Sequence, residues 1–537
     1  MVLSSGDTLG VTTLLGYDAL GRQVASTDPR TGTTTTAYKT GSSLVDWVKD
    51  PANVTQAAYT YDAAGRVATI TDALGKVSRY SYNDRNQKIH EWGDTAYPVE
   101  YVYDALGRQT GMNTFAQSTA TFTGATWPSS PNNAQSTTWN YHAATGFMSS
   151  KTDAQSHSVS FTYTQAGQIA TRTWARGVVT TYAYSATTGE LTGVTYSDGP
   201  PSLAYTYNRL GQTSTVTDYT GTRTFTYNLG GTLELQSEQL GSFYGDHLIS
   251  RGYATTGMVG RYNNLSVGSS GSPGAYYSVD YGYDAQGRPN QVWGVSYAYA
   301  ADSNLISTVT DTWSSSSQVR TYLPTSDTLD TIEGKWSSTT KAKFDYHHDA
   351  MHRIDSVSRT GELFSRYGNG TQGLDGGFGY NDRSEVVSEV TRLGGNPTVL
   401  TGRDDSYDFD LMGNRKSATH NGNAASYTLK NNGLNQYDYR TVPGVFDVAG
   451  RAAAGATVTI NGSSTGVTRH GEYFFKGHGL TNTSNPVNTT LVVSDGTPPR
   501  RTFRLIWRKP RKPSRMTTTA ICSAMAGGTI FMMRRTD

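Results

Sequence analysis

Short stretches of alternating polar and apolar residues follow one another along most of the chain. Residues 78–82 (SRYSY) and 161–163 (FTY) are two examples, and both alternate with a period of two. This period is typical of half-buried β-strands, and the short stretches are separated by residues that favour turns. We therefore predict that most of the chain consists of two-stranded hairpins placed one after another.

A six-residue motif, Tyr-Asp-x-x-Gly-Arg, recurs at these turns. Its four closest copies supply the residues Tyr17, Asp18, Gly21, Arg22, Tyr61, Asp62, Gly65, Arg66, Tyr103, Asp104, Gly107, Arg108, Tyr283, Asp284, Gly287 and Arg288. Looser copies begin at Tyr82, Tyr163, Tyr184, Tyr207 and Tyr227. The spacing of neighbouring copies is about 21 residues, which indicates a repeat protein rather than a mixed fold.

Each position of the motif has a structural explanation. An Asp at the start of a turn accepts hydrogen bonds from backbone N–H groups two residues on, and a Gly three residues later supplies the left-handed conformation that ends a type I turn with a bulge. The Tyr before the turn packs through one ring face, while its hydroxyl needs a partner. We therefore expect these Tyr side chains on a sheet surface that faces a polar interior.

The motif and its spacing resemble the YD repeat of RHS proteins, insecticidal toxin-complex shells and teneurins. Worn copies at 346–353, 380–383 and 409–415 extend the resemblance from residue 1 to about residue 442. The resemblance implies an all-β fold in which hairpins pair edge to edge into one long sheet that coils into a hollow shell. Stacked neighbours would bury each hairpin and cover most strand edges.

Composition agrees with strands and turns. The chain has 58 Gly, 36 Tyr and 17 Pro, and charged residues make up 16% against about 25% in an ordinary globular chain. This excludes a helical bundle. The one Cys excludes a disulfide scaffold and a CxxC zinc site, and no apolar run approaches the roughly 20 residues of a membrane span.

Residues 443–499 differ from the repeats. They contain no Tyr-Asp hexad, but residues 456–460, 472–475 and 491–493 are strand candidates. We predict a small β-sandwich-like module here, placed after a repeat segment at 1–442.

Residues 500–537 differ again. This tail has ten Lys or Arg and one acid, a formal charge of +9, so the total of +2 leaves −7 for residues 1–499. The tail contains none of the 36 Tyr, and its bases read one frame over permit Tyr-Asp repeats. We predict that it is translated out of frame and disordered. The alternatives are a nucleic-acid-binding arm and a membrane-surface segment, which Pro510 and Pro513 disfavour because no amphipathic helix can form. No nucleic-acid partner is expected.

Two strings resemble enzyme motifs. Residues 462–466 fit GxSxG, but strands are predicted on both sides where a nucleophile elbow needs a following helix, which favours a hairpin loop. Residues 368–373 fit GxGxxG, but the glycine-rich residues 374–377 follow where a dinucleotide site needs a helix. We interpret both as loops.

Two places in the sequence contain candidate metal ligands. His348 and His352 have the spacing of two zinc ligands on a helix, but they fall in a worn turn that we interpret as a solvated loop. The cluster Asp404, Asp405, Asp408 and Asp410 lacks the order of a calcium loop, and Asp410 is the Asp of a repeat.

We therefore predict no catalytic residue, no cofactor and no metal site, and a protein that is not an enzyme. RHS cores that release a toxin by aspartyl self-cleavage resemble one another in an Asp-Pro-x-Gly type signature. Residues 28–32 (DPRTG) come near this signature but lie inside an early repeat.

The resemblance implies a secreted or cell-surface shell protein whose intact form encapsulates or presents a C-terminal toxin, or mediates contact between cells. This chain would be a truncated, non-catalytic fragment of it, with no signal peptide after Met1. The alternative is a carbohydrate-binding adhesion module that uses exposed aromatic residues, with Trp92, Trp127, Trp293 and Trp313 as candidates. The partner would then be a cell-surface glycan or protein instead of an enclosed toxin. Aromatic residues more often pack than bind, so we interpret these four as sealing the shell.

Overall fold

The computed structural model describes residues 2–6, 12–116, 118–199, 202–228, 233–254, 260–269, 272–367, 373–480, 487–496, 501–507, 525–526 and 529–534. Within these residues the protein is built from β-strands, with two 3-10 turns, η1 (Ser242–Tyr244) and η2 (Ser365–Tyr367), and no α-helix. The all-β fold predicted from the alternating pattern is therefore confirmed. No helix in the described part is long and apolar enough to span a bilayer.

A single sheet of 37 strands accounts for residues up to 440. Its first part comprises β1 (Val2–Gly6), β2 (Thr12–Tyr17), β3 (Gln23–Asp28), β4 (Gly32–Tyr38), β5 (Val45–Lys49), β6 (Thr55–Tyr61), β7 (Val67–Asp72), β8 (Val77–Tyr82), β9 (Lys88–Gly93), β10 (Val99–Tyr103), β11 (Gln109–Thr114), β12 (Gln135–Tyr141), β13 (Met148–Thr152), β14 (Ser158–Tyr163), β15 (Ile169–Thr173), β16 (Val179–Tyr184), β17 (Leu191–Tyr196), β18 (Leu203–Tyr207), β19 (Thr213–Asp218) and β20 (Gly221–Tyr227).

The second part comprises β21 (Leu235–Gln239), β22 (Leu248–Tyr253), β23 (Tyr262–Ser269), β24 (Ser272–Tyr283), β25 (Pro289–Val292), β26 (Val295–Tyr299), β27 (Ile306–Asp311), β28 (Ser316–Tyr322), β29 (Leu329–Trp336), β30 (Thr339–His348), β31 (Ile354–Thr360), β32 (Leu374–Tyr380), β33 (Val386–Leu393), β34 (Val399–Phe409), β35 (Arg415–His420), β36 (Asn423–Leu429) and β37 (Tyr437–Arg440). Each strand pairs antiparallel with the next one in the chain, so the sheet is a continuous meander.

Consecutive hairpin turns of a meander lie at alternating edges of the sheet. The turns that lead from an even-numbered strand to the next odd-numbered strand carry the Tyr-Asp motif, and we call their edge the motif edge. The other turns form the opposite edge. The ladder shifts by one residue at the motif Tyr, as between Gly16 and Tyr17 or between Thr60 and Tyr61, which is the bulge expected from the turn chemistry.

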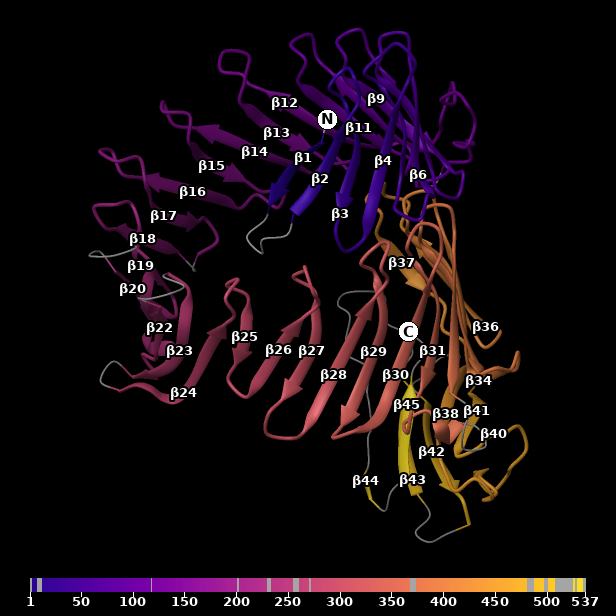
Figure 1. The fold of residues 1–537 in the computed structure, drawn as a ribbon. Coiled ribbons are helices and arrows are strands. Elements are labelled where there is room, and N and C mark those ends of the chain that lie inside the picture. Colours follow the sequence, from indigo (N-terminus) through magenta and orange to yellow (C-terminus); the bar gives the residue numbers. More distant parts are fainter. Residues whose placement is uncertain are drawn as a thin grey trace.

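The sheet coils so that its second half lies below its first half in Figure 1. The hydrogen bonds and ion pairs between the two halves join residues 288 to 306 positions apart in the sequence, so one turn of the coil takes about 300 residues. The motif edge of β28–β35 meets the opposite edge of β3–β10, and we call this contact the seam. Among the described strands, β1 pairs with β2 and β37 pairs with β36, but β1 and β37 do not pair with each other, so the sheet stays open as a coil.

Two smaller sheets follow the coil. One comprises β38 (Val445–Arg451), β40 (Thr468–His470), β41 (Tyr473–Gly479), β44 (Met525–Ala526) and β45 (Thr529–Arg534), and the other comprises β39 (Thr459–Ile460), β42 (Val487–Ser494) and β43 (Arg501–Trp507). Buried Phe446, Val448, Ile460, Phe474 and Leu491 form a core that draws on strands of both sheets. We call these strands the C-terminal module.

The tail at 500–537 is described only at β43, β44 and β45, where no element was expected from the sequence. There β43 pairs with β42, and β45 pairs with β38. The alternation of apolar residues in 501–507 (RTFRLIW) and the apolar run in 529–534 (TIFMMR) suit strands. An out-of-frame origin of this tail stays a prediction.

Candidate functional site

The repeat motif forms the same small network in each close copy. Asp18 accepts backbone hydrogen bonds from the N–H groups of Leu20 (2.9 Å) and Arg22 (3.0 Å), and its second carboxylate oxygen accepts from Arg22 Nε at 2.7 Å. Gly21 has φ +76°, a conformation that other residues adopt at a cost. The backbone hydrogen bond from Arg22, together with its guanidinium, holds the pKa of Asp18 below its usual range. The same geometry recurs at Asp62, Asp104 and Asp284.

The motif also joins each hairpin to the next one. The guanidinium of Arg66 lies 4.9 Å from the ring centroid of Tyr82 in the following repeat. The hydroxyl of Tyr82 in turn donates to the carbonyl of Val67, the residue directly after Arg66, at 3.0 Å. Arg22 with Tyr38, Arg108 with Tyr141 and Arg288 with Tyr299 repeat this arrangement at 4.4, 4.5 and 4.2 Å. Asp therefore orients Arg, Arg packs on the next Tyr, and that Tyr binds back to the preceding repeat.

The repeat pattern predicted a polar interior around the Tyr hydroxyl and no separate role for the Arg. In the structure the hydroxyl of a motif Tyr binds backbone of its neighbour, and Arg is the residue that connects repeats. The equal spacing of 16 residues from Arg22 to Tyr38 and from Arg66 to Tyr82 is the sequence feature that could have indicated this Arg–Tyr contact. Worn copies with Gln in place of Arg are joined to the next motif turn by a hydrogen bond. The Gln87 side chain, for example, donates to the Gly107 carbonyl at 2.7 Å.

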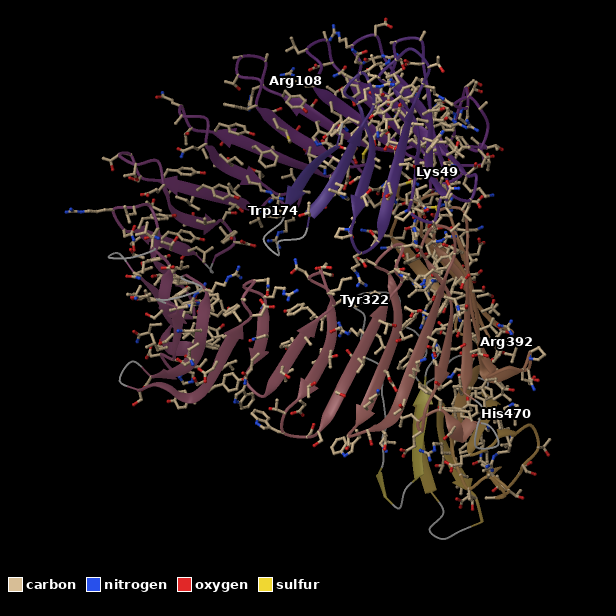
Figure 2. The ribbon with its side chains drawn as sticks, in the orientation of Figure 1. Lys49, Arg108, Trp174, Tyr322, Arg392 and His470 are labelled. Carbon is tan, nitrogen blue, oxygen red and sulfur yellow. The ribbon has the colours of Figure 1, made fainter. Side chains whose placement is uncertain are left out.

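The seam contacts made by Arg30 and Lys76 are polar. Arg30 pairs with Asp327 across it, and the Arg30 guanidinium lies 5.7 Å from the ring centroid of Tyr322. Lys76 Nζ lies 3.0 Å from Asp382 Oδ1, and the hydrogen bond with Asp382 raises the pKa of Lys76. Figure 2 places Tyr322 at the edge of the lower arm that faces the upper arm, and Arg108 at the free upper edge.

His352 belongs to the seam and not to a loop that is surrounded by solvent. It follows Asp349 in a worn motif turn and has φ +59°, the conformation that Gly takes in close copies. Its Nε2 lies 3.4 Å from Asp50 Oδ2, and Gln56 donates to the neighbouring carbonyl of Ala350 at 3.1 Å. The prediction of a solvated loop is therefore incomplete, since this turn packs on the previous turn of the coil.

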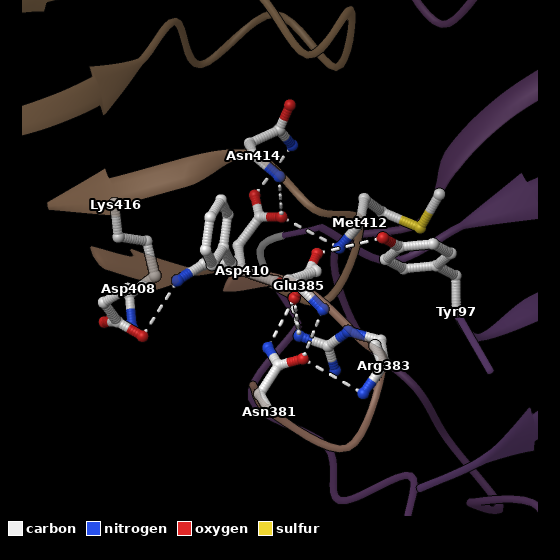
Figure 3. Close-up of polar contacts among 10 residues, drawn as sticks. Tyr97, Asn381, Arg383, Glu385, Asp408, Asp410, Met412, Asn414 and Lys416 are labelled. Carbon is white, nitrogen blue, oxygen red and sulfur yellow. Dashed lines mark hydrogen bonds and ion pairs between the residues drawn. The ribbon is translucent and has the colours of Figure 1, made fainter. Parts of the chain in front are cut away.

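Tyr97 forms the most elaborate seam contact, shown in Figure 3. Its hydroxyl donates to Glu385 Oε1 at 2.9 Å, and the guanidinium of Arg383 lies 5.5 Å from its ring centroid. Arg383 also donates to the carbonyl of Asp410 at 3.0 Å, which joins two neighbouring motif turns. Burial, and then the bond to Glu385, raises the pKa of Tyr97.

An aromatic cluster continues the seam beside Tyr97. The loop between β11 and β12 folds back, so that Phe115, Phe122 and Trp127 pack with Trp92, and Leu411 of a motif turn in the second coil turn packs against them. Trp92 is 5% exposed, and its indole N–H donates to the Gly124 carbonyl at 3.0 Å. Trp92 and Trp127 are thus packed in the seam, in line with the interpretation of these residues as sealing residues.

The other two tryptophans have a different environment. Trp293 and Trp313 are 50% and 65% exposed, and their rings meet edge to face with centroids 4.6 Å apart. Both lie in turns of the opposite edge, after β25 and after β27. The structure thus separates the four candidates into a buried pair and an exposed pair.

The enzyme-like strings lie in loops. Residues 462–466 connect β39 to β40, and these strands pair with β42 and β41. The expected hairpin is therefore wrong, because the loop crosses between the two sheets of the C-terminal module. Of residues 368–373, all but Gly373 lie outside the described residues, and the strand β32 follows.

The acidic residues at 404–410 have different partners and do not form one site. Asp410 accepts from the backbone N–H groups of Met412 and Asn414, as a motif Asp does. Asp405 contacts His420 instead, and Asp408 pairs with Lys416 at the surface. No group of three or more metal-ligating side chains occurs among the described residues.

A histidine between two carboxylates joins the coil to the C-terminal module. His420 on β35 lies between two carboxylates, with Nδ1 2.6 Å from Asp405 on β34 and Nε2 2.7 Å from Asp447 on β38. Burial by itself lowers the pKa of His420, but the hydrogen bonds to Asp405 and Asp447 outweigh it and raise the pKa to about 9. Next to this contact, Leu400 packs with Tyr473 and Phe475 in a buried cluster.

The comparisons with known proteins follow this geometry. Residues 54–90, which contain the motif copies at Tyr61 and Tyr82, match the RHS Repeat family model. No curated protein matches the chain.

Three solved structures share the fold. They are TcdB2-TccC3-Cdc42 (TM-score 0.51, 14% identity, 80% of this chain and 27% of that chain), TcdB2-TccC3 without its hypervariable C-terminal region (0.51, 14%, 78% and 26%) and TcdB2-TccC3-TEV (0.50, 13%, 98% and 32%). The chain thus spans about a quarter to a third of the length of the chains it matches. The chain therefore carries an RHS repeat at residues 54–90, and its repeated hexad and hairpin coil make it similar to RHS/YD-repeat proteins.

Proposed function

We propose that the chain is a wall segment of a secreted or cell-surface RHS shell whose intact form encloses or presents a C-terminal toxin, or mediates contact between cells. The seam carries this proposal. It locks one turn of the coil onto the next through ion pairs, a cation–π contact and an apolar cluster, which is what a continuous wall requires. The similar solved structures support it through their fold.

The proposed role is structural and not catalytic. The fixed residues of the motif are used in turns and in bonds between repeats, so their identity is explained without substrate. The enzyme-like and metal-like strings lie in strands, turns and loops that serve the fold. The proposed partner is a folded passenger on the inner side of the wall.

The test uses the complete assembly that carries these repeats in its producing cell. Electron cryomicroscopy should show a second folded mass inside the coil, and limited proteolysis should spare it until the wall opens. A seam double variant, Lys76→Glu with Tyr97→Ala, should make the enclosed mass sensitive to protease. Lys39→Glu is the matched control, because Lys39 pairs with Asp46 at a motif turn of the first coil turn, an edge that the seam does not use.

Two results would contradict the enclosure. One is an empty coil in the complete assembly. The other is a passenger that is cleaved at the same rate with the intact seam and with the double variant.

Glycan binding through exposed aromatics is the alternative function. The structure removes Trp92 and Trp127 from it, because both are packed in the seam cluster, and leaves Trp293 and Trp313. A glycan array probed with the intact chain and with Trp313→Ser separates the two functions. Binding that depends on Trp313 would favour adhesion.

A further inference from the structure

The seam uses only one of the two edges in each turn of the coil. The first turn contributes its opposite edge, from β3 to β10, and the second turn contributes its motif edge, from β28 to β35. The motif edge from β2 to β18 and the opposite edge from β19 to β30 have no such contact among the described residues. The molecule therefore has two unlike free edges that correspond to the two halves of its own seam.

The free motif edge exposes leucines. Leu20, Leu106 and Leu210 follow the motif Asp or Asn by two positions, in the turns after β2, β10 and β18, and Leu106 is 77% exposed. We call these three residues the leucine edge. A leucine at the tip of a tight turn adds nothing to the Asp and Gly network of that turn, so its exposure needs another explanation.

The free opposite edge exposes aromatic rings. Connections between strands from β19 to β30 carry them, with Trp336 as the last residue of β29, and we call this set the aromatic edge: Tyr219, Phe243, Trp293, Trp313 and Trp336. Neighbouring turns place their rings in contact, with centroids 6.4 Å apart for Tyr219 and Phe243 and 4.6 Å apart for Trp293 and Trp313. Contiguous exposed apolar surface of this kind marks an interaction site more often than single exposed residues do.

The seam shows what covers such residues. Leu411, one position after the motif Asp410, packs against the aromatic cluster of Trp92, Phe115 and Phe122 from the first coil turn. Arg383 of the neighbouring motif turn packs on the ring of Tyr97 from an opposite-edge turn. In both contacts a motif turn supplies the apolar or cationic group and the other side supplies the aromatic ring.

The same edge is covered once more further along. At β33 and β34, Leu393 and Leu400 pack against Tyr473 and Phe475 of the C-terminal module. From β3 to β10 the opposite edge is therefore covered by motif turns of the second coil turn, and at β33 and β34 it is covered by the module. The stretch from β19 to β30 between these regions has neither cover in the described residues.

We propose that the aromatic edge docks the leucine edge of a second copy of this chain, which continues the coil head to tail. The contact would repeat the chemistry of the seam, with motif-turn leucines of one copy on aromatic rings of the other. Because the two edges differ, the interface is heterologous, and each added copy leaves one edge of each kind free. Association should therefore proceed past the dimer. The proposal does not depend on an enclosed passenger.

The first experiment is sedimentation velocity of the intact chain over a concentration range of about 1 to 100 µM, where weak specific contacts are populated. We expect a weight-average mass that rises with concentration through dimer and larger species. The double variants Trp293→Ser/Trp313→Ser and Leu20→Ser/Leu106→Ser should each weaken association at least about ten-fold.

Mixing the two double variants is the decisive step. Each retains one intact edge of a different kind, so the mixture should form a one-to-one complex that grows no further, although neither variant associates alone. Leu14→Ser and Tyr439→Ser are matched controls, because both side chains are exposed but lie on strands and not in edge turns. If either double variant melts earlier than the intact chain, Trp336→Ser and Leu210→Ser replace it.

Several results would overturn the proposal. They are a chain that stays monomeric at the highest concentration, association that persists in both double variants, and a mixture that forms no complex. Glycan binding that depends on Trp313 in a chain that does not self-associate would assign the aromatic edge to a sugar instead.

Discussion

His420 should make the attachment of the C-terminal module to the coil depend on pH. Its pKa is about 9, against 6.5 in an unfolded chain, because it lies between the carboxylates of Asp405 and Asp447. A raised folded-state pKa means that the stabilisation is fully present below about pH 6.5 and is lost as the pH rises through about 9. A rise of the pKa from 6.5 to about 9 corresponds to about 3 kcal/mol, and the His420 side chain is only 13% exposed, so solvent screening is small.

His420→Gln should cost at least as much near neutral pH. Removing the cation leaves Asp405 and Asp447 facing one another without a positive charge, and breaking a buried ion network in this way costs about 3 to 5 kcal/mol. The chain has more than one folding unit, so a single global unfolding energy is not the appropriate measure. The relevant quantity is the free energy of opening at the junction between β35 and β38.

Pulse proteolysis in urea measures that opening, with cleavage near residues 441–444 as the readout, from about pH 6 to about pH 9.5. We expect opening to become easier by about 3 kcal/mol across this range in the intact chain and to be nearly independent of pH in His420→Gln. His157→Gln is the control, because His157 pairs with Asp153 in an exposed turn. An equal pH dependence in the intact chain and in His420→Gln would refute the reasoning.

Three further predictions concern the repeats and the seam. Arg66→Ala should destabilise its hairpin by about 1 to 2 kcal/mol, because it removes the guanidinium that packs on the ring of Tyr82. Hydrogen exchange of β7 and β8 should report this loss. Unchanged protection would contradict the role of Arg as a connector. Tyr97→Phe removes the hydroxyl bond to Glu385 and should cost about 1 kcal/mol of seam stability. Exchange in the turn after β32 should rise, whereas a rise confined to β9 and β10 would argue against contact across the seam. Gly107→Ala should cost about 1 kcal/mol or more, since φ is +83° there; an equal melting temperature for this variant would exclude a required left-handed turn.

Much of the architecture follows from local pattern. Alternation with a period of two and the turn chemistry of Asp and Gly depend on neighbouring residues alone, so the all-β class, the hairpins and their bulges could be predicted from the sequence. The motif at Tyr61 is an example, since its turn and its ladder shift lie within six residues. The change of sheet after Arg440 also coincides with the end of the repeats.

The contacts that give the coil its shape do not follow from local pattern. Tyr97 and Glu385 are 288 residues apart, and their meeting depends on the twist and coiling summed over more than twenty strands. The same sum decides that Trp92 is buried in the seam while Trp313 stays exposed, although both lie next to or in turns of the opposite edge. His420 acquires its two carboxylates only when the module docks on the coil. The sequence by itself thus determined the repeating unit, because that unit is held by short-range bonds, and the tertiary structure alone decided which edges meet, because that depends on a geometry accumulated along the whole sheet.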